Sequence, residues 1–326
     1  MILLAASLIA ACGSGTEIRH YSGLAQGTTY HLSLVVPAGF DAAPVHRAVI
    51  DEFARIDQTF SNYRRDSVIE RFNRSRSTDP VEVGPGLVEL VAKAARVHEA
   101  SLGCFDPTIV PLSQLWQQSA RSGRLPSEEA VDVVRQRIGM GDIEVIDALH
   151  LAKRRADLAL DLSGIAQGES LARLADVVES AGIEAYAIEI GGEVLLRGAR
   201  PGGGPWRVAL LDPVHTDRVL GIRIEHRGET RLAVTTSASS APGSAADHPR
   251  PPHILDPRTG RPVAHDTVAV TVVHTDPALA DAWSTALLCL GREAGMAVAE
   301  RNRIAVLFVR SDGAIAVSKT WPGTPP

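Results

Sequence analysis

His253-Ile254-Leu255-Asp256-Pro257-Arg258-Thr259-Gly260 is the segment around which this chain is organised. It brings an imidazole, a carboxylate, a guanidinium and a hydroxyl into eight residues. Pro257 fixes its own φ and Gly260 can adopt a positive φ, so the segment is predicted to be a tight turn after a short strand. One interpretation is an Asx turn, in which Asp256 only accepts hydrogen bonds from its own backbone. Most polar turns are only turns, and the segment taken alone favours that interpretation.

The elements expected on both sides of this turn indicate the fold class. Apolar residues at helical spacing predict helices at 45–60, 86–101, 165–181 and 279–290, with another starting near Pro126. Alternating or β-branched stretches predict strands at 27–36, 186–190, 206–211, 218–225, 232–236, 267–273 and 304–309, with two or three short strands within 143–162. There is no internal repeat and no strict βαβ alternation. We therefore expect an α+β fold of mainly antiparallel, mixed sheets with packed helices.

The composition is that of an ordinary globular protein. The 326 residues are 45% hydrophobic and 22% charged, so the chain can bury a sizeable core in one large domain or two interlocked ones. The net charge of −5 provides no general electrostatic attraction for nucleic acid, and we expect no nucleic-acid partner.

The N-terminal residues resemble the signal of a bacterial lipoprotein. Residues 1–11 are apolar and too few to span a bilayer as a permanent helix, which suits the apolar part of a signal peptide. Ile9-Ala10-Ala11-Cys12 resembles the lipobox, in which the cysteine becomes the lipidated N-terminus. We expect a signal peptide and lipobox at 1–12, a linker at 13–23, and a membrane-anchored lipoprotein on the periplasmic side of the bacterial envelope. No basic residues precede the apolar run, which indicates a start upstream of Met1.

Two further cysteines, Cys104 and Cys289, form no recognisable pattern. A single remaining pair argues against a disulfide scaffold. Cys289 lies in an apolar helical run and is expected to be a small core residue.

Two short patterns suggest phosphate and metal chemistry. Asp281 and Thr285 are four residues apart in an expected helix, so their oxygen atoms lie on one face and would suit Mg²⁺. The alternative is an exposed Asp near a helix start beside a Thr that bonds its own helix backbone, and spacing alone favours it. The loop 161–168 leads from a strand into a helix, whose free N–H groups favour phosphate.

Eight blocks of residues follow one another along the chain. They are Gly27-Thr28-Thr29-Tyr30, Ser61-Asn62-Tyr63, Gly103-Cys104-Phe105-Asp106-Pro107-Thr108, Asp161-Leu162-Ser163-Gly164-Ile165-Ala166-Gln167-Gly168, Gly191-Gly192-Glu193, Thr236-Ser237, the segment 253–260, and Ala280-Asp281-Ala282-Trp283-Ser284-Thr285-Ala286. Eight blocks in this order are hard to obtain by chance, and together they resemble the ApbE family of bacterial FAD:protein FMN transferases. The resemblance covers roughly residues 24–310 and implies an ApbE-like domain at 24–318, followed by a frayed tail at 319–326.

The resemblance implies a Mg²⁺-dependent enzyme of the bacterial envelope. Such an enzyme splits the diphosphate of FAD, transfers the FMN half to a Thr or Ser hydroxyl of an acceptor protein, and releases AMP. The residues that would contact FAD are Tyr63, Cys104, Phe105, Asp106, Asp161, Gln167 and Ile254. The residues that would hold Mg²⁺ are Gly164, through its carbonyl, Asp281 and Thr285. His253 would be the base that deprotonates the acceptor hydroxyl, and an imidazole suits a base near neutral pH.

The chain departs from the family pattern around the FAD. Gln167 and Glu169 stand where the family commonly has Lys and Tyr, and Ala172 and Ala238 also differ from the usual residues. The missing Lys removes a positive charge, and Glu169 is expected to add a negative one near the FAD. Two alternatives therefore stay open: a flavin-binding lipoprotein that transfers nothing, and an FAD pyrophosphatase in which water replaces the acceptor.

Overall fold

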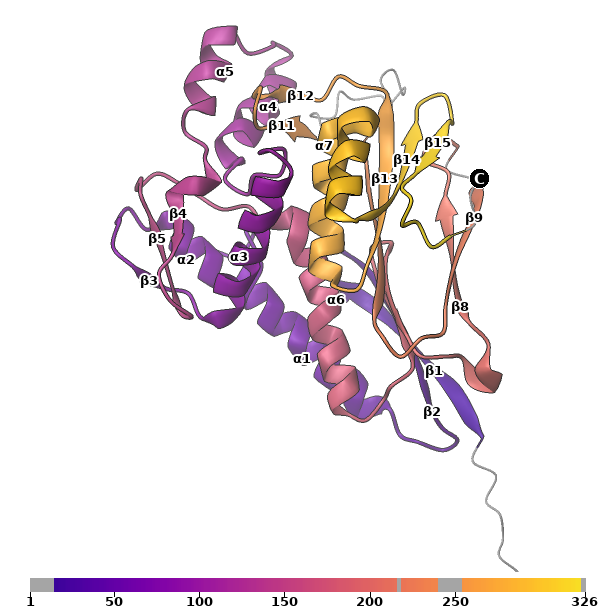
Figure 1. The fold of residues 1–326 in the computed structure, drawn as a ribbon. Coiled ribbons are helices and arrows are strands. Elements are labelled where there is room, and N and C mark those ends of the chain that lie inside the picture. The colour runs from indigo at the N-terminus through magenta and orange to yellow at the C-terminus, as the bar shows by residue number, and fades with distance from the viewer. Residues whose placement is uncertain (1–14, 216–217, 240–253, 324–326) are drawn as a thin grey trace, which may run out of the picture.

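The computed structural model describes residues 15–215, 218–239 and 254–323, and its frame is one large antiparallel sheet (Figure 1). The strand order is β1-β2-β6-β7-β10-β13-β14-β15, and every neighbouring pair is antiparallel. The strands are β1 (Thr16–Ala25), β2 (Thr28–Pro37), β6 (Tyr186–Ile190), β7 (Glu193–Arg197), β10 (Leu232–Ala238), β13 (Thr267–His274), β14 (Ala305–Arg310) and β15 (Ile315–Val317). The expected α+β class with mainly antiparallel sheets is confirmed.

The α-helices of the described residues lie on one side of this sheet (Figure 1). They are α1 (Ala43–Phe60), α2 (Val68–Arg74), α3 (Pro85–Ala100), α4 (Val110–Ser122), α5 (Glu128–Arg135), α6 (Ser163–Ser180) and α7 (Pro277–Asn302). The other face is covered by the hairpin β8 (Trp206–Leu211) and β9 (Val219–His226). Strand β14 shows that both faces of the sheet are buried. Val306 and Phe308 belong to the core under the helices, and the alternate residues Leu307 and Val309 belong to the core under the hairpin.

Two small sheets complete the fold in the described part of the chain, one beside α3 and one beside α4 (Figure 1). One contains β3 (Val81–Glu82), β5 (His150–Lys153) and β4 (Ile143–Val145), and the other pairs β11 (Leu255–Asp256) with β12 (Arg261–Pro262). The turn between β11 and β12 is the segment predicted from Pro257 and Gly260, and Gly260 has a φ of +69°. The tight turn after a short strand is therefore confirmed.

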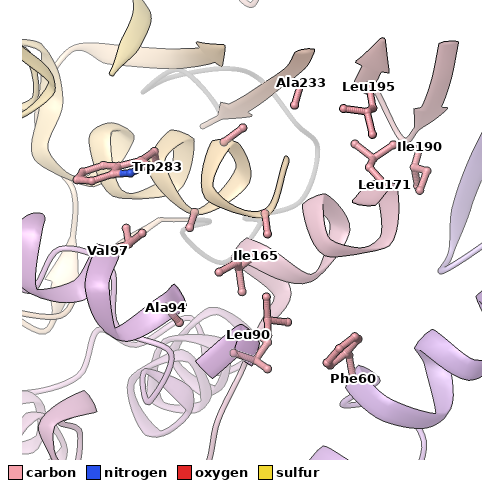
Figure 2. Packing of buried hydrophobic residues seen from close by; sticks show 14 of the residues in the cluster. Phe60, Leu90, Ala94, Val97, Ile165, Leu171, Ile190, Leu195, Ala233 and Trp283 are labelled. Carbon is pink, nitrogen blue, oxygen red and sulfur yellow. The ribbon is translucent and has the colours of Figure 1, made fainter. Parts of the chain in front are cut away.

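Helices α6 and α7 approach each other unusually closely in the main core. A Cβ on Gly168 would lie 2.1 Å from the carbonyl oxygen of Pro277 and 2.8 Å from Cα of Ala278. Only glycine fits there, because both neighbours are backbone atoms of α7. Figure 2 shows Leu90 and Val97 of α3 and Ile165 of α6 in the same core, near the N-terminal part of α7.

Two helices were not expected from the sequence. Helix α2 begins at Ser67, whose hydroxyl accepts the Glu70 N–H, so Ser67-Val68-Ile69-Glu70 contained an overlooked N-terminal capping signal. Helix α4 buries only Leu112 and Trp116, too little apolar periodicity to stand out. The helical segment α7 also extends further than expected, because a second helical stretch follows a kink at Gly291, where φ is +72°.

Both ends of the described chain contradict the sequence analysis. Residues 16–23 belong to β1, which pairs with β2 from Thr16 to Ala25, so the linker assigned to 13–23 is wrong there. The side chain of Trp321 packs under the hairpin and the Lys319 N–H donates to Glu300 at 2.8 Å, so residues 319–323 are not a frayed tail. The signal peptide and lipobox at 1–12 lie outside the described residues. In the part of the chain described, no helix combines the length and apolarity needed to cross a membrane.

Candidate functional site

A cavity of about 520 Å³ lies where α4, the start of α6, α7 and β11 meet the loop after α3. This volume is typical of small-molecule sites. The predicted site residues that line it are Tyr63, Cys104, Phe105, Asp106, Asp161, Gly164, Ile254 and Thr285. These eight residues come from five separate stretches of sequence, so the fold gathers most of the predicted FAD contacts at one place.

Three predicted residues do not line this cavity or cannot be placed. Gln167 is turned away, and its Nε2 donates to the carbonyl of Ile190 at 2.6 Å. Asp281 is buried and accepts the Gly168 N–H, and it does not line the cavity. The proposed base His253 lies outside the described residues, although its neighbour Ile254 lines the cavity.

Other lining residues were missed by sequence reasoning. They are Pro107, Ile109, Ser113, Trp116, Gln117, Ser163, Leu255 and Cys289. Trp116 and Gln117 were missed because α4 itself was not predicted. The indole of Trp116 donates to the Gly260 carbonyl at 2.8 Å, which attaches α4 to the β11–β12 turn.

The loop after α3 holds a buried carboxylate in a fixed orientation. Asp106 Oδ1 accepts the Thr108 N–H at 2.8 Å and the Thr108 hydroxyl at 2.6 Å, while Oδ2 accepts the Met140 N–H at 3.3 Å. His98 Nδ1 lies 2.8 Å from the Phe105 carbonyl and 3.6 Å from Asp106 Oδ2. These bonds position Phe105 and Asp106 together at the cavity wall.

The N-terminus of α6 opens into the cavity. Asp161 Oδ1 accepts the Ser163 N–H at 2.9 Å, and the Asp161 N–H donates to the Pro107 carbonyl at 2.7 Å. Ser163 and Gly164 both line the cavity. Because the positive end of the helix dipole lies there, this end of α6 favours a phosphate group.

Asp281 and Thr285 form the hydroxyl and carboxylate pair predicted for a metal. Asp281 is only 4% exposed, so the alternative of an exposed Asp near a helix start is wrong. Thr285 Oγ1 lies 3.1 Å from the Ser237 hydroxyl. A Cβ on Gly164 would lie 3.3 Å from Thr285 Oγ1. Glycine at 164 therefore leaves open the space beside Thr285.

A second buried carboxylate, Glu193 at the start of β7, lies against Asp281. Burial raises the pKa of Asp281, an effect that the Gly168 hydrogen bond of 3.0 Å opposes. Burial and the neighbouring charge of Asp281 raise the pKa of Glu193 well above its usual range. Glu193 Oε2 has no hydrogen-bond partner in the described part of the chain. Two facing carboxylates with an unpaired oxygen and nearby hydroxyls fit a hard cation such as Mg²⁺.

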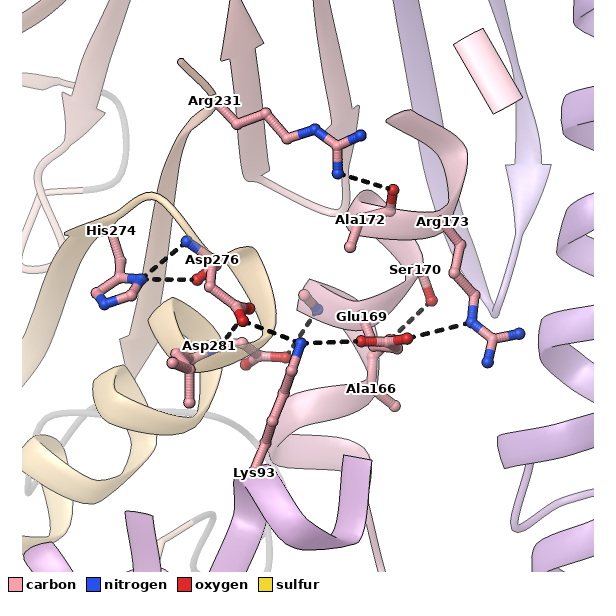
Figure 3. A network of polar contacts seen from close by, with 12 residues as sticks. Lys93, Ala166, Glu169, Ser170, Ala172, Arg173, Arg231, His274, Asp276 and Asp281 are labelled. Carbon is pink, nitrogen blue, oxygen red and sulfur yellow. Dashed lines mark hydrogen bonds and ion pairs between the residues drawn. The ribbon is translucent and has the colours of Figure 1, made fainter. Parts of the chain in front are cut away.

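Glu169 does not add negative charge to the cavity, contrary to the sequence expectation. Its carboxylate points the other way along α6, 3.6 Å from Lys93 Nζ and 3.2 Å from Arg173 Nε (Figure 3). Lys93 also contacts Asp276 at 2.9 Å. Glu169 therefore belongs to an ion-pair network between α3, α6 and α7, and the departure at this position leaves the cavity unchanged.

The β11–β12 turn is an Asx turn with an additional ion pair. Asp256 Oδ1 accepts both the N–H and the Nε–H of Arg258 at 2.9 Å, and Oδ2 accepts its Nη2–H at 2.8 Å. The Gly260 N–H donates to the Asp256 carbonyl at 2.8 Å. Asp256 and Arg258 thus shape the turn.

Cys104 and Cys289 form a disulfide, which the sequence analysis did not expect. Cys289 is buried as predicted, but it is a cross-link rather than a free core residue. The Asp256 carboxylate lies within 4.8 Å of both sulfur atoms. Because both sulfurs are in the disulfide, this group offers no thiolate to a metal, and it is distinct from the predicted Mg²⁺ site.

This antiparallel α+β fold, with a helix N-terminus and buried carboxylates beside one cavity, defines a protein suited to a phosphorylated ligand and a hard cation. The ApbE family profile matches residues 26–308, and the chain belongs to the ApbE family.

Two relatives named FAD:protein FMN transferase show the extent of the similarity. The protein from Vibrio cholerae serotype O1 is 35% identical over 305 residues, covering 93% of this chain and 90% of the relative. The protein from Escherichia coli K12 is 32% identical over 314 residues, covering 94% of this chain and 87% of the relative.

Solved structures give the same result. The flavin transferase ApbE from Vibrio cholerae matches with a TM-score of 0.83 at 33% identity, covering 94% of this chain and 98% of that one. The apo form of the Pseudomonas stutzeri flavinyl transferase ApbE matches with a TM-score of 0.81 at 31% identity, covering 94% and 97%.

Proposed function

We propose that this enzyme transfers the FMN half of FAD to a Thr or Ser hydroxyl of an acceptor protein, with Mg²⁺ bound, and releases AMP. The observation that carries the proposal is one cavity that both the α6 N-terminus and Thr285 line, with the buried Asp281 one helical turn before Thr285 in α7. The names of the Vibrio cholerae and Escherichia coli relatives agree with this activity. FAD is the substrate, and a second protein supplies the hydroxyl.

The reaction is a displacement at the flavin-side phosphorus. The acceptor oxygen forms a new bond to that phosphorus, the bridging P–O bond breaks, and AMP leaves with the electron pair of that bond. Asp281, Thr285 and the Gly164 carbonyl would hold Mg²⁺, which neutralises charge on the phosphate oxygens when bound. The first turn of α6 binds the diphosphate, and Asp106 and Asp161 orient the rest of the nucleotide. His253 takes the proton of the acceptor hydroxyl, a role that typically contributes on the order of 10²–10⁴-fold.

We also propose that the enzyme works on the periplasmic side of the bacterial envelope, attached to the membrane by lipid at Cys12. The lipobox-like sequence before Cys12 supports this location. The Cys104–Cys289 bond supports it independently, because disulfides persist in oxidising compartments.

Incubating the purified protein with FAD, Mg²⁺ and a Thr-containing acceptor, followed by mass spectrometry of the acceptor, tests the activity. We expect a covalent FMN adduct on the acceptor and an equal amount of AMP. FMN and AMP released into solution with no adduct would identify a pyrophosphatase instead. FAD bound without any cleavage would identify a flavin-binding protein.

A further inference from the structure

The Cys104–Cys289 disulfide joins two walls of the cavity. Cys104 immediately precedes Phe105 in the loop after α3, and Cys289 lies in α7. Both residues line the cavity, each is only 3% exposed, and 185 residues separate them in sequence. The bond therefore fixes the position of the loop relative to α7.

Cys289 occupies the same face of α7 as the predicted metal ligands. Asp281, Thr285 and Cys289 follow at intervals of four residues, and residues four apart stack along one side of an α-helix. The disulfide thus attaches the Phe105–Asp106 wall to the helix face that carries Asp281 and Thr285.

Hydrogen bonds do not make this connection in the described part of the chain. The amides of residues 101–105 donate to acceptors at 97–101, such as Gly103 to the His98 carbonyl at 2.9 Å and Phe105 to the Ser101 hydroxyl at 3.1 Å. Leu102 and Gly103 both have positive φ, which is uncommon for leucine. The loop is closed on itself in a strained conformation, and the disulfide is its covalent attachment to α7.

We propose that this disulfide holds the cavity wall in the conformation that binds the nucleotide, so that reducing it weakens flavin binding. The choice of FAD as the ligand rests on the proposed function. The reduction is a thiol–disulfide exchange with a small dithiol: the S–S bond takes two electrons and two protons, and the dithiol becomes a cyclic disulfide. Cys104 and Cys289 then carry free thiols, and the loop loses its covalent attachment to α7.

Linkage gives a reciprocal consequence. If the disulfide increases the affinity for FAD by some factor, bound FAD must favour the disulfide over the dithiol by the same factor. Saturating FAD should therefore make the Cys104–Cys289 disulfide harder to reduce. The factor should equal the one by which reduction weakens FAD binding.

The first test compares FAD affinity of the full-length protein in four states by fluorescence titration. These are the oxidised wild type, the wild type reduced with dithiothreitol, Cys289→Ser, and Cys104→Ser/Cys289→Ser. We expect the last three to bind FAD more weakly by the same factor, about fivefold or more, since ordinary coupling between sites has this size. Dithiothreitol should not change the double variant, which is the matched control.

The variant Cys289→Ser separates positioning from direct contact, because it keeps the Cys104 side chain and removes only the bond. Wild-type affinity in this variant would show that Cys104 acts through contact and would overturn the proposal. So would an oxidised wild type in which peptide mapping finds both cysteines as thiols.

Hydrogen–deuterium exchange tests the same inference without FAD. Reduction should accelerate exchange at the amides of residues 101–105 while the amides of β2 remain protected. Uniform acceleration would indicate loss of stability only, and unchanged exchange in the loop would show that the disulfide does not hold it. Either result overturns the proposal, whatever the flavin measurement gives. Failure of the oxidised wild type to bind FAD, with the expected exchange pattern, would contradict the proposed function and leave the positioning of the wall supported.

Discussion

Replacing Gly168 with alanine should separate α6 from α7 and disturb the predicted metal ligand. A Cβ at this position would lie 2.1 Å from the Pro277 carbonyl oxygen, so the helices would have to move apart by about 1.3 Å to reach an ordinary contact of 3.4 Å. The same movement weakens the 3.0 Å hydrogen bond from the Gly168 N–H to Asp281. Neither helix can yield locally, because the clash is between backbone atoms and a Cβ.

The expected loss of stability follows from these two effects. Overpacking of a core typically costs about 1–3 kcal/mol, and a lost hydrogen bond costs about 1 kcal/mol. Together about 2–4 kcal/mol should lower the Tm of Gly168→Ala by roughly 3–6 °C. The rise in Tm on adding Mg²⁺ should also be smaller than in the wild type, because a displaced Asp281 binds the ion less tightly.

Thermal unfolding with and without Mg²⁺ measures both effects. Gly141→Ala is the matched control, since no atom lies within 4 Å of the added Cβ, and it should change stability by less than about 0.5 kcal/mol. A Gly168→Ala variant with a Tm within about 2 °C of the wild type and an unchanged Mg²⁺ response would refute the reasoning.

Three further predictions concern the metal, the base and the lipid. Asp281→Ala should abolish Mg²⁺-dependent transfer in the acceptor assay, and wild-type Mg²⁺ dependence would exclude it as a ligand. Because burial raises the pKa of Asp281, the part of the stability that depends on this residue should, without metal, be fully present below about pH 4 and be lost as the pH rises through the raised value; denaturant titrations should show a smaller loss over this range for Asp281→Asn. His253→Asn should keep FAD affinity within a few-fold of wild type and nearly lose transfer, as titration and acceptor mass will show; unimpaired transfer would remove His253 from the mechanism. Cys12→Ala should prevent labelling by a fatty-acid analogue in cells, and persistent label would contradict the lipid anchor.

Local patterns predicted most of the elements that position the site. Helix α3 was expected at 86–101 and spans Pro85–Ala100, because its apolar residues recur at helical spacing and bury one face. Helix α4 was missed because it buries only two side chains, and with it Trp116 and Gln117 were lost from the predicted cavity wall. A short amphipathic signal is weak in sequence even where the helix lines a site.

Local reasoning placed the charge of Glu169 wrongly. Its position near the start of α6 suggested that its carboxylate would lie near the FAD. Side chains around a helix point in different directions, however. Its carboxylate meets Lys93 and Arg173 instead. Which direction a helical side chain takes depends on what packs against each face, and that is a property of the tertiary structure.

The sequence by itself determined the family, the α+β class and the cavity residues that lie within short, recognisable blocks such as Cys104–Asp106 and Asp161–Gly164. Tertiary structure alone decided the pairing of Cys104 with Cys289 and the burial of Asp281 against Glu193. The physical reason is range: turns, caps and periodicity act over a few residues, whereas a disulfide across 185 residues and a buried carboxylate pair exist only after distant segments have packed together.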